Sequence, residues 1–193
     1  MDVGLLILRL LLAFVLYAHA TQKVFGWFSG PGLGGAAAIF EKLGQRPGRT
    51  MALLAATCEA SAALLLLLGF LTPLGAAIAA GTMFVGGMSM TRMSGTFWNA
   101  AGGGEYPFVL AGGAAVLGFT GAGALSLDSV IDGPWHQPGD PVAIAIGAGA
   151  AVLALLAAIP PLVRMRRSAG VAVAATGAAS SGRSSHSSGT RPS

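Results

Sequence analysis

The chain has 193 residues, of which 54% are hydrophobic and only 9% are charged. Because an ordinary soluble domain has about 25% charged residues, this composition indicates an integral membrane protein. The single cysteine, Cys58, excludes an intrachain disulfide and a CxxC thiol relay. The formal net charge of +4 does not suggest a nucleic-acid partner, since the basic residues cluster at segment ends, where membrane topology explains them.

The first apolar segment begins almost at residue 1 and is interpreted as a retained helix. It lacks the features of a cleaved signal peptide, because Asp2 stands where a basic region belongs and Arg9 interrupts the apolar run. Five such segments are candidates for crossing a bilayer, which takes about 20 residues each. They cover approximately 4–23, 51–71, 74–92, 106–122 and 142–163.

These segments predict an all-α polytopic membrane protein with three parts. Residues 1–133 are expected to form a four-helix transmembrane bundle, and 134–167 a fifth, C-terminal span with its flanks. Small residues in the third and fourth segments predict close helix packing. The Ser/Gly/Ala-rich residues 168–193 are expected to form a disordered cytoplasmic tail.

The charges of the connecting segments predict the orientation. The segments around 24–50, after 92 and after 163 are basic, whereas 123–141 contains Asp128, Asp132 and Asp140 and no Lys or Arg. With five spans, all basic segments lie on one side, so the N-terminus is expected outside and the C-terminus in the cytoplasm of a bacterial plasma membrane. A short helix in the 24–50 segment, with Ile39, Phe40 and Leu43 on one face, is expected to lie along the cytoplasmic membrane surface.

Glu59 is the most unusual residue, because it lies within the apolar run LLAATCEASAALLLLLGF. A carboxylate in the middle of a span is unfavourable by roughly 2.5–3.5 kcal/mol on insertion scales and needs a partner. The first helix offers Arg9, His19 and Lys23, which all fall within about 80° of one face at 100° per residue.

Depth along the helices favours Arg9 as that partner. Glu59 is expected ~12 Å from the cytoplasmic boundary, level with Ala13, which places Arg9 ~6 Å further out and His19 ~9 Å further in. Arg9–Glu59 is therefore the preferred pair, with His19 or Lys23 as the next choices.

Two interpretations of this polar cluster stay open: a structural clasp between helices, or a site for a ligand, a proton or a quinone. His19 could also be a capping or interfacial residue, and Cys58 a small buried apolar residue rather than a redox group. Haem held by two histidines would need a second membrane-embedded histidine, which the chain lacks. The sequence shows no phosphate-binding loop and predicts no metal site.

The order of these motifs resembles the DoxX family of bacterial membrane proteins over about residues 4–133. The elements are Arg9, then HATQKVFGWFSGPGLGG with His19 and Lys23, then Glu59, RMSGTFWNAAGGGEYP and GAGALSLDSVI. The fourth element adds candidate secondary site residues: Arg92, Trp98, Asn99, Glu105 and Tyr106. The sequence departs from the family where Ala20 follows the histidine and where Thr91 stands in place of a histidine that many members carry.

The resemblance implies a four-helix membrane bundle associated with oxidoreductases, because the family is named after a subunit of a thiosulfate:quinone oxidoreductase. Mycobacterial members are linked to a complex with superoxide dismutase and a thiosulfate sulfurtransferase, and the Gly/Ala-rich composition suits an actinobacterium. The expected function is a membrane subunit of an assembly for thiol or oxidative stress or quinone chemistry. Soluble oxidoreductases are its expected partners at the cytoplasmic face, and quinone is a possible cofactor. The alternative is a non-redox lipid or small-molecule carrier.

Overall fold

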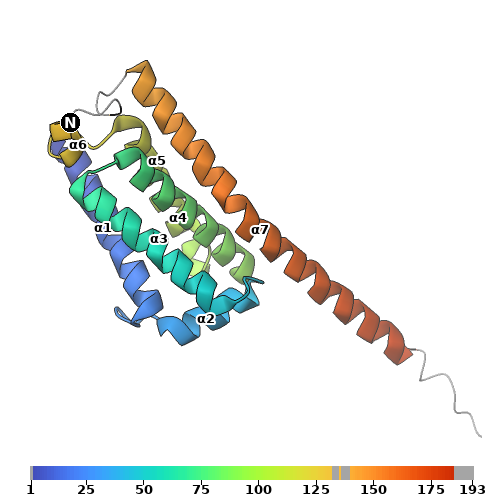
Figure 1. Ribbon diagram of the computed structural model, residues 1–193. Helices are drawn as coiled ribbons and strands as arrows, with labels where there is room; N and C mark the ends of the chain where they lie inside the picture. Colours follow the sequence, from blue (N-terminus) through green and yellow to red (C-terminus); the bar gives the residue numbers. More distant parts are fainter. Residues whose placement is uncertain (1, 132–134, 136–139, 185–193) are drawn as a thin grey trace, which may run out of the picture.

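The computed structural model describes residues 2–131, 135 and 140–184, with side chains as far as Ser168 (Figure 1). Every regular element in these ranges is helical, which confirms the predicted all-α class. The elements are α1 (Asp2–Val24), α2 (Gly32–Lys42), α3 (Gly48–Leu68), α4 (Thr72–Ser94), the 3-10 turn η1 (Asn99–Ala101), α5 (Glu105–Thr120), α6 (Leu127–Ile131) and α7 (Pro141–Ser184).

Four helices in the described ranges are long and apolar enough to cross a membrane: α1, α3, α4 and residues 141–168 of α7. The chain is thus a multi-pass membrane protein. The span expected at 106–122 corresponds to α5, which has only 16 residues and is shorter than the roughly 20 that a crossing normally takes. Four of the five predicted spans are therefore long enough to cross, and the crossing by the shorter α5 stays a prediction. α5 ends early because Gly121, with φ 73°, breaks the helix.

The long helices run alternately up and down, as Figure 1 shows, and enclose one apolar core. α1 packs on α3, α3 on α4, and α4 on α5. The core is built from alanines and a few larger side chains, among them Leu16, Leu66 and Leu117. Alanine-rich contact faces let the helix backbones approach closely, which is how helices associate in lipid.

α7 covers one side of the bundle by lying across α4 and α5. It comes close to α5 at Gly147, where an added Cβ would lie 2.5 Å from the carbonyl oxygen of Gly118. Only a glycine fits there. The helix continues through Pro160 and Pro161 to Ser184, so the structure differs from the predicted disordered tail over 168–184. The alanines of this stretch favour helix, and residues 185–193 lie outside the described ranges.

The two ends of the bundle differ in charge. The end that holds α2 carries exposed cations, and we call it the basic end: Lys42, Arg46, Arg49, Arg92, Arg164, Arg166 and Arg167. The opposite end holds the start of α1, α6 and the start of α7. There the buried Asp128 accepts hydrogen bonds from the N–H groups of Leu71 and Thr72 and from the Thr72 hydroxyl. This carboxylate satisfies the free N–H groups at the start of α4.

Candidate functional site

A cavity of about 440 Å³ lies in the half of the bundle nearer the basic end. Its walls come from α1, α2, α3, α4 and α7, with Pro107 from α5, and most of the residues that line it are apolar. The charged and imidazole groups on its surface are those of His19, Lys23 and Glu59. An apolar pocket of several hundred Å³ with a few convergent polar groups is the usual form of a small-molecule site.

Lys23 and Glu59 form an ion pair at the wall of this cavity. The Lys23 Nζ lies 2.7 Å from Glu59 Oε1 and 2.8 Å from Oε2, and it also donates to the His19 carbonyl oxygen at 3.4 Å. The Glu59 side chain is only 4% exposed, whereas that of Lys23 is 20% exposed. The carboxylate of Glu59 therefore has its counter-charge inside the protein.

Arg9 does not pair with Glu59, so the preferred pair from the sequence was wrong. Arg9 is buried at the opposite end of α1 and α3, where its guanidinium donates to four backbone carbonyl oxygens. These belong to Leu66, Leu67, Ala122 and Leu125, at 2.8–3.2 Å. Arg9 thus adds hydrogen bonds to carbonyl groups in the C-terminal turn of α3 and joins this turn to the segment after α5.

The direction of the side chains explains this outcome. In a helix each Cα–Cβ bond leans toward the N-terminus. Because α1 and α3 are antiparallel, Lys23 and Glu59 lean toward each other, while Arg9 leans away from Glu59 and toward the end of α3. The positions of the Cα atoms along the helix axes do not include this lean. The lean favours the more distant Lys23 over the nearer Arg9 as the partner of Glu59.

Of the other candidates, His19 lies beside this pair, and Tyr106 contacts only His19 among these residues. His19 lines the cavity, and its ring lies 6.3 Å from that of Tyr106, measured between centroids. Glu105 instead accepts a hydrogen bond from the Asn99 N–H in the turn before α5. The remaining secondary candidates, Arg92, Trp98 and Asn99, are exposed and are not among the residues that line the cavity.

The short helix α2 forms part of the cavity wall. Its predicted apolar face, Ile39, Phe40 and Leu43, borders the cavity, and within this face Phe40 and Leu43 are partly buried while Ile39 is exposed. Next to it, the buried Gln45 donates from Nε2 to the Pro161 carbonyl oxygen at 2.7 Å, linking the α2–α3 loop to α7. No sequence pattern indicated a role for Gln45, because a lone glutamine in a loop is normally solvated.

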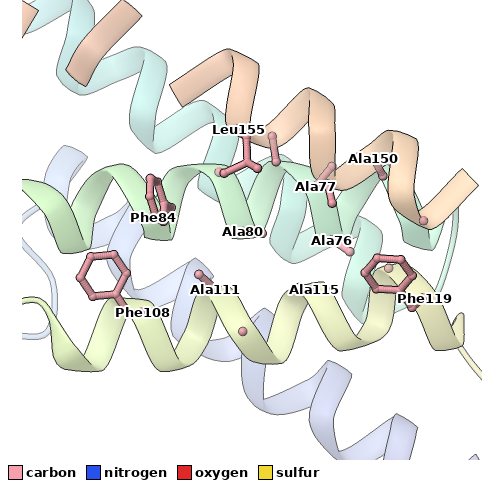
Figure 2. A pocket seen from close by; sticks show the side chains of 16 residues that line it. Ala76, Ala77, Ala80, Phe84, Phe108, Ala111, Ala115, Phe119, Ala150 and Leu155 are labelled. Atoms are coloured by element: carbon pink, nitrogen blue, oxygen red, sulfur yellow. The ribbon is translucent and has the colours of Figure 1, made fainter. Parts of the chain in front are cut away.

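A second, smaller cavity of about 330 Å³ lies between α4, α5 and α7 (Figure 2). Alanines and glycines line it, with Phe84 and Phe108 near one end and Phe119 near the other. Its lining contains no charged residue. Ala77, Gly81 and Ala154 line both cavities, so the two lie on either side of the contact between α4 and α7.

Comparison with known proteins relates part of the chain to a family. The DoxX family model matches residues 4–92, which include Arg9, His19, Lys23 and Glu59. The match ends before α5, so the resemblance expected over 93–133 and the actinobacterial origin stay predictions. No curated protein matches the chain, and no solved structure matches it. Residues 4–92, from the start of α1 to the last turn of α4, are thus similar to the DoxX family, which is consistent with a DoxX family protein.

Proposed function

We propose that this protein is a membrane subunit of an oxidoreductase-associated assembly and that the cavity beside Lys23 and Glu59 binds the ring of a quinone. The observation that carries the proposal is the cavity itself, which joins a long apolar wall to a few buried polar groups. DoxX proteins are membrane proteins often linked to oxidoreductases, and this context supports a redox ligand. A soluble oxidoreductase would supply the electrons.

The charge balance of the cavity favours a neutral ligand. Lys23 and Glu59 neutralise each other, so a charged ligand would bring an uncompensated charge into a site of low polarity. A quinone ring is neutral and carries carbonyl oxygens that accept hydrogen bonds. His19 lies on the same wall, and an imidazole N–H can donate to such an oxygen.

The experiment uses decylubiquinone and the thermal stability of the detergent-solubilised protein. A ligand that binds only the folded state raises the unfolding temperature. The test variant is Ala55→Trp, which fills the cavity, and the control is Ala60→Trp, because Ala60 is exposed on the same helix. We expect decylubiquinone to stabilise the wild type and Ala60→Trp but not Ala55→Trp. Equal stabilisation of both variants would refute binding in this cavity.

The alternative function is a lipid or small-molecule carrier without redox chemistry. The observation that favours it is the second cavity, whose purely apolar lining suits a hydrocarbon chain. Purification in a mild detergent, with identification of co-eluting proteins and extracted lipids, distinguishes the two. Co-eluting oxidoreductases support the proposed function, whereas a stoichiometric lipid without a protein partner supports the carrier.

A further inference from the structure

The α2–α3 loop and α7 meet at the basic end, and this junction concentrates positive charge. Arg46 lies in the loop and Arg49 in the first turn of α3, while Arg164 lies on α7. The Gln45–Pro161 hydrogen bond holds the two elements together beside these residues. All three arginines are exposed.

These arginines have no ion-pair partner among the described side chains, where the one salt bridge is Lys23–Glu59. The nearby carboxylate of Glu41 accepts instead from the Gly48 backbone N–H at 3.4 Å. The positive charge at the junction is therefore not neutralised within the described part of the chain, and an anion outside it can bind there.

The surroundings of Arg164 identify the kind of anion. Its Nη1 lies 3.5 Å from the Sδ of Met51, and Met51 lines the cavity. Arg49 and Arg164 each lie at the end of an apolar helical segment of membrane-spanning length, which is the level of the lipid head groups. An anion bound at Arg164 thus has an apolar surface directly beside it.

We propose that this junction is a binding site for an anionic phospholipid, with its phosphate held by Arg46, Arg49 and Arg164 and the start of one acyl chain against Met51. Basic pockets between membrane helices are suited to such head groups. A soluble acidic protein would bind the charge but would leave the apolar surface next to it unused. The proposal does not depend on which ligand the cavity binds.

The test is a titration of the purified protein in neutral detergent with dioleoyl phosphatidylglycerol, followed by native mass spectrometry. Dioleoyl phosphatidylcholine serves as the zwitterionic comparison. We expect tighter binding of the anionic lipid and, because each surface cation contributes about fivefold, a loss of roughly twentyfold or more in Arg49→Gln/Arg164→Gln. Both residues are exposed, so this variant should keep the unfolding temperature of the wild type.

The control is Arg166→Gln. This variant removes the same charge from the same turn of α7. Because Arg166 lies two residues after Arg164, a rotation of about 200° around the helix, its side chain faces away from that of Arg164. We expect Arg166→Gln to bind the anionic lipid nearly as well as the wild type. An equal loss in Arg166→Gln would overturn the site in favour of diffuse attraction. Equal affinity of the wild type for both lipids would also overturn the site and would indicate that the arginines bind a protein partner instead.

Discussion

At the scale of single residues, the Lys23–Glu59 pair predicts how stability responds to charge removal. Removing one member of a buried ion pair leaves the other charge unpaired and typically costs 3–5 kcal/mol. Since Lys23 is partly exposed, we expect a loss of about 3 kcal/mol for Glu59→Gln and less for Lys23→Gln, whose remaining carboxylate can be protonated. The double variant should recover much of the loss, as thermal unfolding in detergent will show.

The matched comparison is the pair that the sequence favoured. Arg9 and Glu59 make no hydrogen bond or salt bridge to each other, so the losses in Arg9→Gln and Glu59→Gln should add. Additive losses for Lys23 and Glu59 would instead show that these two are not energetic partners. The double variant Lys23→Gln/Glu59→Gln also separates a clasp from a ligand site. If the pair helps to bind quinone, this variant regains stability but does not regain quinone binding.

A second prediction concerns Arg9→Lys, which keeps the positive charge but loses the hydrogen-bonding geometry of the guanidinium. The guanidinium reaches carbonyl groups on both α3 and the segment after α5, and a lysine ammonium has three donors on a single nitrogen. Arg9→Lys should therefore lose at least one charged hydrogen bond, worth about 1.5–3 kcal/mol. Arg166→Lys, at an exposed position, is the control and should leave the unfolding temperature unchanged. Equal stability of the two variants would contradict the role of Arg9.

At the scale of helices, the position of α7 depends on the contact between Gly147 and Gly118. A larger side chain at 147 would collide with a backbone carbonyl oxygen, and such overpacking typically costs 1–3 kcal/mol. Gly149 offers a control, since an added Cβ there meets no heavy atom within 4 Å. We predict that Gly147→Leu displaces α7 from α5 and that Gly149→Leu does not.

The displacement can be measured with a disulfide between α4 and α7. The Ser89 Oγ lies 3.4 Å from the Met165 Sδ, so Ser89→Cys and Met165→Cys in a Cys58→Ser background should cross-link on mild oxidation. Gly147→Leu should reduce this cross-link strongly, and Gly149→Leu should preserve it. Undiminished cross-linking in Gly147→Leu would mean that the contact at 147 does not position α7.

The sequence was sufficient for the long helices α1, α3 and α4, because apolar length alone sets a membrane span. It also singled out His19, Lys23 and Glu59, which border the cavity, since charges in an apolar run are few. It failed on their pairing, because the Lys23–Glu59 contact depends on the lean of side chains across two antiparallel helices. It could not predict the cavity, whose walls come from six helices, or the cap by Asp128, which joins α6 to the start of α4, 56 residues away.

At the scale of the whole molecule, the remaining question is whether the short α5 completes a crossing. α4 ends at the basic end with Arg92 in its last turn, and α5 ends near the start of α1, where the Ala124 N–H donates to Asp2 at 2.9 Å. α7 begins at that same end (Figure 1). The chain must therefore return from one end to the other through α5, whose 16 residues rise about 24 Å against a hydrocarbon core of about 30 Å.

This geometry and the basic residues at one end lead to a topology prediction. Reporters fused after residues 45 and 102 should read the cytoplasm, because basic segments stay on that side, and a reporter after residue 135 should read the exterior. The 102 and 135 fusions flank α5, so opposite results for these two mean that 16 residues cross the bilayer, with the glycine-rich turns at both ends of α5 making up the missing length. The same result for both would show that α5 does not cross. The up-and-down order of the helices in the bundle would then not match the sides of the membrane on which their ends lie.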